Sequence, residues 1–153
     1  MKKFLLVIAI TVTSIIELNA QTFEYKQITS IESIVPMGLG RSRIISSDEN
    51  RNYQDFTSKR TEDNKKQNKS KRKDAKIDQF EETKLVNFYS IAGINFQNVA
   101  SNDALLSSKI NTMVTEGWDL AFVTSAVESD AGKGDGKGIF VTRYIFKRPK
   151  PQQ

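Results

Sequence analysis

The stretch that decides the fold is residues 101–127, which read SNDALLSSKINTMVTEGWDLAFVTSAV. Its first half repeats apolar residues every three or four positions, as the buried face of a helix requires, at Leu106, Ile110 and Met113. Gly117 follows, and a glycine in the left-handed conformation commonly ends a helix. Three short polar residues suited to cap the first turn precede the apolar pattern: Ser101, Asn102 and Asp103. The sequence therefore predicts a helix that begins near residue 101 and ends at Gly117.

The residues after Gly117 change to a period of two, which predicts a strand. One face of this strand is expected to carry Trp118, Leu120, Phe122 and Thr124. Residues 139–147 alternate in the same way, and a Gly-rich segment separates the two runs, so we expect an antiparallel hairpin. Both faces of the last strand carry apolar groups. One face should meet the helix, and the other should meet the segment around Phe88 or a second subunit.

Earlier residues add further strands to this hairpin. Residues 22–27 alternate large apolar and polar side chains, and residues 28–35 keep a β-branched character until the turn Met37-Gly38-Leu39-Gly40. Residues 41–45 resume the strand pattern, and residues 84–91 are rich in aliphatic and aromatic side chains. The predicted fold class is α+β, with an antiparallel sheet of three to five strands and one main helix packed on one face.

The first twenty residues have the features of a signal peptide. Lys2 and Lys3 precede an apolar run over residues 4–16, and Leu18-Asn19-Ala20 ends on a small residue suited to cleavage before Gln21. The run holds about thirteen residues, fewer than the roughly twenty that a membrane-spanning helix needs. We therefore expect an exported protein, periplasmic or secreted, that does not span the membrane.

Composition excludes several kinds of chemistry. The chain of 153 residues contains no cysteine and no histidine. Disulfides, thiolate metal sites, cysteine nucleophiles, lipid anchoring through a cysteine and histidine-based pH switches are therefore excluded. Residues 21–148 are expected to form a single domain held together by its hydrophobic core, and residues 149–153 a disordered tail.

Positive charge is concentrated in one segment. Residues 59–76 hold nine Lys or Arg against three Asp or Glu, whereas the rest of the mature chain is slightly acidic. Between Phe56 and Phe80 only Ala75 and Ile77 are apolar, so little surface is available for burial. We expect residues 47–78 to form a mobile basic insert in the domain.

Two roles remain open for this insert. It could contact a polyanion, such as an anionic glycan of the cell envelope, a membrane surface or a nucleic acid, or it could be a solvated linker. No aromatic side chain interrupts the lysines and arginines, which argues against stacking on nucleic-acid bases. The candidate polyanion contacts are Lys65, Lys66, Lys69, Lys71, Arg72 and Lys73.

The candidates for catalysis or for cofactor binding are weak. Residues 130–138 are rich in Gly and Lys, but Gly follows each Lys and a strand follows the loop, so they do not form a phosphate loop. The same residues lack the closing carboxylate of a calcium loop. Ser108 and Lys109 are adjacent on the predicted helix and do not face each other. The carboxylate pairs are more simply solvated charges: Glu81 with Glu82, and Glu116 with Asp119. We expect no cofactor, no metal and no enzymatic activity.

Three short motifs occur in a familiar order: Phe23-Glu24-Tyr25-Lys26, then Glu116-Gly117-Trp118-Asp119-Leu120, then Tyr144-Ile145-Phe146-Lys147-Arg148. In this order the chain resembles the bacterial family called domain of unknown function 4177, over residues 21–28 and 100–148. The resemblance implies a small α+β fold and no established activity, so it carries over no catalytic residue. The expected structural anchors are Tyr25, Gly117, Trp118 and Phe146.

Taken together, these observations predict an exported, non-enzymatic interaction or structural module. Its partner is expected to be a protein that the sequence does not identify. The alternative is an envelope polyanion, bound through residues 59–76.

Overall fold

The computed structural model describes residues 22–33, 42–128 and 138–150. The predicted signal peptide and the predicted turn at residues 37–40 lie outside these residues, and so does nearly all of the Gly-rich segment at 130–138.

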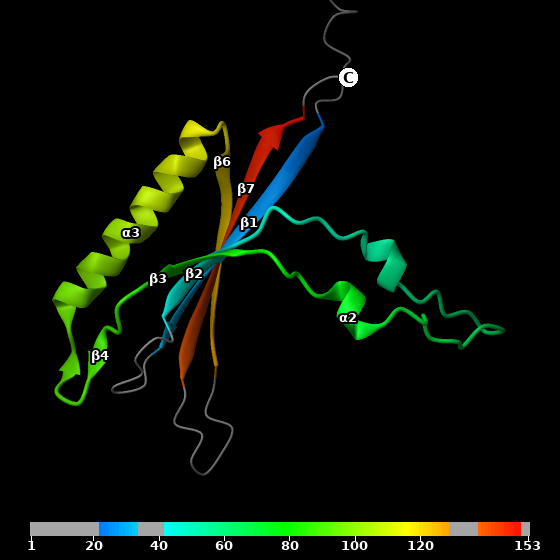
Figure 1. Ribbon diagram of the computed structural model, residues 1–153, viewed down its shortest axis with the longest axis horizontal. Helices are drawn as coiled ribbons and strands as arrows, with labels where there is room; N and C mark the ends of the chain where they lie inside the picture. The colour runs from blue at the N-terminus through cyan, green and yellow to red at the C-terminus, as the bar shows by residue number, and fades with distance from the viewer. Residues whose placement is uncertain (1–21, 34–41, 129–137, 151–153) are drawn as a thin grey trace, which may run out of the picture.

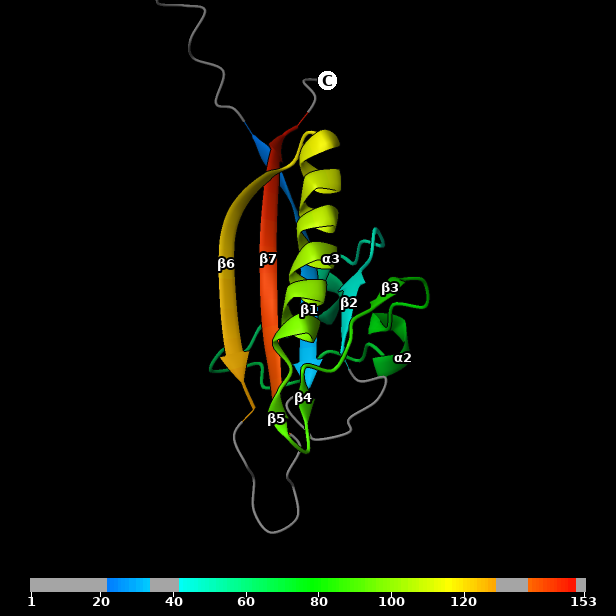
Figure 2. The ribbon, with the colours of Figure 1, turned by 90° about the vertical axis from the view of Figure 1, so that its left-hand side faces the viewer.

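One antiparallel sheet and one long helix form the body of the molecule (Figures 1 and 2). The sheet has five strands in the order β3-β2-β1-β7-β6, and α3 packs on one of its faces. The predicted α+β class with one main helix is confirmed. The bounds are β1 (Phe23–Ser33), β2 (Arg43–Ser46), β3 (Glu81–Lys84), α3 (Phe96–Thr115), β6 (Asp119–Val127) and β7 (Ile139–Pro149).

The first and last strands of the described chain lie side by side in the middle of the sheet. β1 and β7 pair over their full length, from Phe23 opposite Pro149 to Ser33 opposite Ile139. The backbone N–H of Lys150 also donates to the carbonyl of Thr22, at 2.8 Å. Pro149 therefore belongs to β7 and Lys150 is hydrogen-bonded to the chain before β1, so the predicted start of the tail at residue 149 is too early.

The core lies between α3 and one face of the sheet. Ile28, Phe146, Met113 and Trp118 form one buried cluster, and Ile44, Leu85 and Leu106 form another. Tyr144 contacts both clusters. Trp118 and Phe146 thus hold the core positions that the sequence predicts for them, because the chain turns directly from α3 into β6 at Trp118.

The helix begins earlier than predicted. Asn95 caps it, and the Asn95 side chain accepts hydrogen bonds from the backbone N–H groups of Gln97 and Asn98. Asn102, an expected cap, instead lies inside the helix with 1% of its surface exposed. The predicted end is confirmed, since Gly117 has φ +83° immediately after the last turn.

Tyr25 is not a core anchor. The helix covers the face of β1 that carries Ile28 and Ser30, both of which are buried. Successive residues of a strand point to opposite faces, so Tyr25 lies on the face away from α3, and 63% of its surface is exposed. We call this uncovered side of the sheet the open face.

The predicted strand at residues 84–91 is interrupted. β3 ends at Lys84, because the next side chain, Leu85, turns into the core. The chain then forms a small hairpin from β4 (Tyr89–Ser90) and β5 (Gly93–Ile94), in which Gly93 has φ +107°.

The hairpin of β6 and β7 is confirmed, but the predicted faces of β6 are only partly correct. The pairing shifts between Leu120 and Phe122, where Ala121 forms an irregularity in the ladder. After this shift Val123, rather than Phe122, lies opposite Tyr144 and so on the helix side of the sheet. Phe122 and Thr124 therefore lie on the open face.

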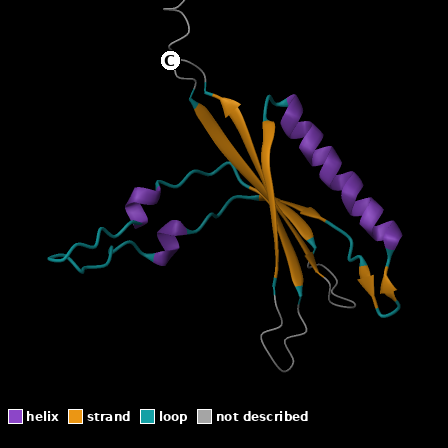
Figure 3. Cartoon of the chain, turned by 180° about the vertical axis from the view of Figure 1, so that it is seen from behind, coloured by secondary structure: helices purple, strands orange, loops and turns teal. Residues whose placement is uncertain are grey.

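Residues 47–80 form a long arm between β2 and β3, which projects away from the sheet on the side opposite α3 (Figures 1 and 3). The arm contains two single-turn helices, η1 (Tyr53–Phe56) and α2 (Arg72–Ala75). Its two halves are joined by hydrogen bonds, among them Arg51 to the carbonyl of Lys76 at 2.8 Å and the Asn68 amide to the carbonyl of Asp55 at 2.9 Å. The predicted mobility of residues 47–78 stays a prediction.

Candidate functional site

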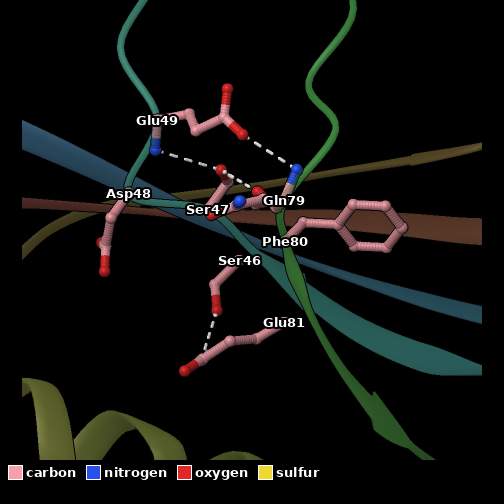
Figure 4. Close-up of a pocket in the computed structure, with 7 residues that line it drawn as sticks. All are labelled: Ser46, Ser47, Asp48, Glu49, Gln79, Phe80 and Glu81. Carbon is pink, nitrogen blue, oxygen red and sulfur yellow. Dashed lines mark hydrogen bonds between the residues drawn. The ribbon is translucent and has the colours of Figure 1, made fainter.

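An open pocket of about 440 Å³ lies where the arm leaves the sheet (Figure 4). Both ends of the arm contribute to it, because β2 leads into the arm and β3 follows it. The pocket is lined by Ser46, Ser47, Asp48, Glu49, Gln79, Phe80 and Glu81.

Two hydrogen bonds across this pocket hold the two ends of the arm together, and a third positions Ser47 within one end. The Ser47 hydroxyl donates to the carbonyl of Gln79 at 2.9 Å, and the backbone N–H of Glu49 donates to the same hydroxyl at 3.1 Å. The backbone N–H of Gln79 donates to the Glu49 carboxylate at 2.8 Å. Figure 4 shows that these hydrogen bonds link Ser47, Glu49 and Gln79 into a ring. They continue the pairing of β2 and β3 into the arm and fix where its two halves depart.

Glu81 joins the arm's base to the helix. Its carboxylate accepts a hydrogen bond from Lys109 of α3 at 2.8 Å and one from the Ser46 hydroxyl at 3.0 Å. The ammonium group of Lys109 and the Ser46 hydroxyl lower the pKa of Glu81 below its ordinary value. Glu82 lies on the other face of β3 and pairs with Arg43 at 2.7 Å. The two adjacent carboxylates therefore have separate partners, and they do not face each other as an acid and a base.

The two other carboxylates of the pocket are also engaged. Asp48 pairs with Lys26, which lowers the pKa of Asp48. The backbone N–H of Gln79 lowers the pKa of Glu49. Arg51 has a smaller effect in the same direction, with its guanidinium nitrogen 2.7 Å from a carboxylate oxygen of Glu49. Among the described residues no group of three or more His, Cys, Asp or Glu side chains is arranged to hold a metal ion. The pocket as a whole resembles a structural clamp.

Trp118 lies beside this region, with two cations over its ring. The guanidinium carbon of Arg148 is 4.2 Å from the ring centroid, and the Lys26 ammonium is 6.0 Å away. Arg148 also pairs with Glu24. Only 7% of Trp118 is exposed, because the two cations cover the part of its ring that the core residues do not contact.

The six predicted polyanion contacts all lie on the arm and are exposed. Lys71, Arg72 and Lys73 lie at the start of α2, and the other three lie on the stretch before it. The ion pairs found among the described residues involve none of these six cations; their basic members are Lys26, Arg43, Arg51, Lys109 and Arg148.

A second exposed surface was not anticipated as a site. In β6 every residue except Ala121 is exposed, including Phe122 at 67%, Val123 at 53% and Val127 at 56%. The sequence signal was available, because residues 120–127 are apolar on both faces of the predicted strand. It could not be interpreted without knowing that β6 forms an edge of the sheet.

Comparison with known proteins adds no identification. No family model, no curated protein and no solved structure matches this chain. The resemblance to domain of unknown function 4177 therefore stays a prediction. Within residues 22–33, 42–128 and 138–150, no helix has the length and apolar character that crossing a membrane requires.

Proposed function

We propose that this protein is an exported, non-enzymatic interaction module whose basic arm contacts an anionic polymer or an anionic surface. The observation that carries the proposal is the arm itself. It holds the nine exposed lysines and arginines of residues 59–76 away from the body of the molecule, on a segment whose two ends are hydrogen-bonded to each other where it leaves the sheet.

The distribution of charge supports an anionic partner. Residues 59–76 are strongly basic, while the rest of the mature chain is slightly acidic. Attraction between exposed charges extends only about 8–10 Å at physiological salt. A partner drawn by this field would therefore meet the arm first, and the body of the domain would remain outside the contact.

The state of the carboxylates supports a binding role rather than a catalytic one. The described carboxylates with a shifted pKa are Asp48, Glu49 and Glu81, and in each the shift is downward. A general acid at neutral pH needs a raised pKa, and a general base needs one near neutrality. These groups are instead ionised partners of cations and of backbone N–H groups.

The proposal predicts binding that depends on the arm and on salt. We expect the mature protein, residues 21–153, to bind immobilised polyphosphate, a polycarboxylate polymer and vesicles with anionic lipids at low ionic strength. Each lysine near an anionic surface contributes about 1 kcal/mol, so the triple variant Lys65→Gln/Lys66→Gln/Lys69→Gln should weaken binding by roughly a hundredfold. Dissociation constants measured at several salt concentrations test this, and the effect should shrink as salt rises.

A variant with the same loss of charge outside the arm serves as the control. Lys84→Gln/Arg143→Gln/Lys150→Gln removes three exposed cations from the sheet and its end. It should bind nearly as well as the wild-type protein. Equal weakening by both triple variants would show that net charge alone drives binding. Absence of binding to all three probes would leave the arm as a spacer, and a structural module would then be the better description. Binding to vesicles alone or to polymers alone identifies the source of the anion.

A further inference from the structure

The two edges of the sheet differ in how they are protected. β3 is four residues long and reads Glu-Glu-Thr-Lys, and charged, short edge strands discourage pairing with other chains. β6 is nine residues long and carries one charged residue, Asp119, with no lysine and no proline. Its irregularity at Ala121 lies near the start and leaves Phe122–Val127 in regular pairing with β7. The uncharged part of this edge, Phe122–Val127, is therefore open to pairing with another strand.

The side chains of β6 are uncovered on both faces. α3 lies over the middle of the sheet, and β6 runs beside it as the outermost strand (Figure 2). On the helix side Val123 and Val127 are more than half exposed. On the open face Phe122 is the most exposed of the large apolar residues of the strand. A strand that pairs with β6 must consequently tolerate apolar neighbours on both of its own faces.

A second copy of the segment Phe122–Val127 is a strand with apolar side chains on both faces, so it meets this requirement. In an antiparallel arrangement centred on Thr124, Phe122 lies opposite Ala126 of the partner subunit, and Val123 lies opposite Ser125 of the partner subunit. A large side chain therefore meets a small one at each of these pairs, and Thr124 meets its own copy, which is a favourable cross-strand pair. The six residues contain no charge, so the pairing brings no like charges together within this segment.

We propose that β6 pairs antiparallel with β6 of a second copy of this chain, which joins two five-stranded sheets into one of ten strands. The two-fold axis passes between the two Thr124 residues. Both α3 helices then lie on the same face of the joined sheet, and both arms project from the other face. This inference does not depend on polyanion binding by the arm.

A cysteine at the axis gives the sharpest test, because the wild-type chain has no cysteine. Residues directly opposite in antiparallel strands have Cα atoms about 4.5–5.5 Å apart, within the range that a disulfide spans. Under mild oxidation Thr124→Cys should become almost entirely a disulfide-linked dimer. Gln27→Cys, on the same face but on the central strand β1, should remain mostly monomeric under identical conditions. Equal crosslinking of the two variants would overturn the proposed register.

The oligomeric state of uncrosslinked protein gives an independent test. Sedimentation of the wild-type protein should show dimers at micromolar concentrations. Thr124→Lys places two ammonium groups at the axis and should weaken dimerisation by at least tenfold. Gln27→Lys adds the same charge to the open face away from the edge and should leave the dimer intact, with circular dichroism confirming that both variants fold. A monomeric wild-type protein would refute the proposal. Loss of the dimer in Gln27→Lys as well would place the contact on the open face instead of the edge.

Discussion

Asn102 is a buried polar residue whose hydrogen bonds join the helix to the chain that leads into it. Its carbonyl oxygen accepts from the backbone N–H of Val86 at 2.9 Å, and its amide donates to the carbonyl of Val86 at 2.9 Å and to Glu32 at 3.0 Å. Asn102 thus pairs with Val86 much as a neighbouring strand would. This pairing stabilises the chain where β3 has ended.

We expect Asn102→Ala to lower the free energy of unfolding by about 2–3 kcal/mol. The substitution leaves both backbone groups of Val86 without their partner and creates a small cavity beside Leu106. Urea denaturation followed by Trp118 fluorescence measures the loss. Ser101→Ala is the matched control, because Ser101 is exposed one position earlier on the same helix, and it should change stability by less than about 0.5 kcal/mol. A similar loss in both variants would contradict the role given to Asn102.

Gly117 provides a test of backbone conformation alone. A Cβ at this position would meet no atom within 4 Å, so any loss must come from its φ of +83°. We expect Gly117→Ala to cost about 1–2 kcal/mol of stability. Gly117→Asn should cost clearly less, since asparagine adopts the left-handed conformation more readily. Thermal or urea unfolding distinguishes the two variants, and an equal cost for both would point to packing instead of conformation.

At the scale of the elements, the contact of α3 with β2 and β3 includes, beside its apolar cluster, an ion pair between Lys109 and Glu81 whose strength varies with pH. Lys109 lowers the pKa of Glu81 in the folded protein from its ordinary value of 4.5. A lowered pKa stabilises the fold fully above that ordinary value, and the stabilisation disappears as the pH falls through the lowered pKa. Lys26 acts in the same direction on Asp48.

We therefore expect the unfolding midpoint to be nearly constant from pH 7 to about pH 5 and to fall below that range. Glu81→Gln should lower the midpoint slightly at pH 7 and make the decrease in acid shallower. Glu62→Gln, a carboxylate on the arm, should leave the whole profile unchanged. Both effects should be small, because 73% of the Glu81 side chain is exposed. A Glu81→Gln profile parallel to that of the wild type would show that the ion pair does not contribute.

The type of most elements could be predicted from local patterns, but the faces they bury could not. The period of β1 correctly indicates a strand, and only the position of α3 decides that Ile28 rather than Tyr25 is buried. The irregularity at Ala121 has no glycine to mark it, so the sequence pattern predicts an unbroken alternation through Phe122. The start of α3 was misplaced because Asn102 could cap a helix or fill a buried site, and that choice depends on Val86, which is distant in sequence.

On the scale of the whole molecule, one candidate site could be predicted from local sequence, and the others depend on contacts between distant residues. The basic residues of the arm could be identified from composition alone, since charge in a segment with few apolar residues is a local property. The clamp formed by Ser47, Glu49 and Gln79 could not, because it joins residues about thirty positions apart. The exposed edge of β6 depends on the strand order, which no local pattern contains.

If both proposals hold, a dimer would present two basic arms on one face of a continuous sheet. Two linked contacts with one polymer strengthen each other, because the second forms at a high effective concentration. Thr124→Lys should then weaken binding to a long polyphosphate chain more than binding to a short one that spans a single arm. An equal loss of affinity for the long and the short polyphosphate would show that polyphosphate binding does not depend on dimerisation.

The pairing of β1 with β7 has a consequence for when the chain can fold during its synthesis. These two strands form the centre of the sheet, yet more than a hundred residues separate them in sequence. A chain delivered from its amino end cannot complete its core until residues 139–149 have emerged, and closing so long a loop is slow. The protein should therefore remain without its complete core until residues 139–149 are free to pair with β1.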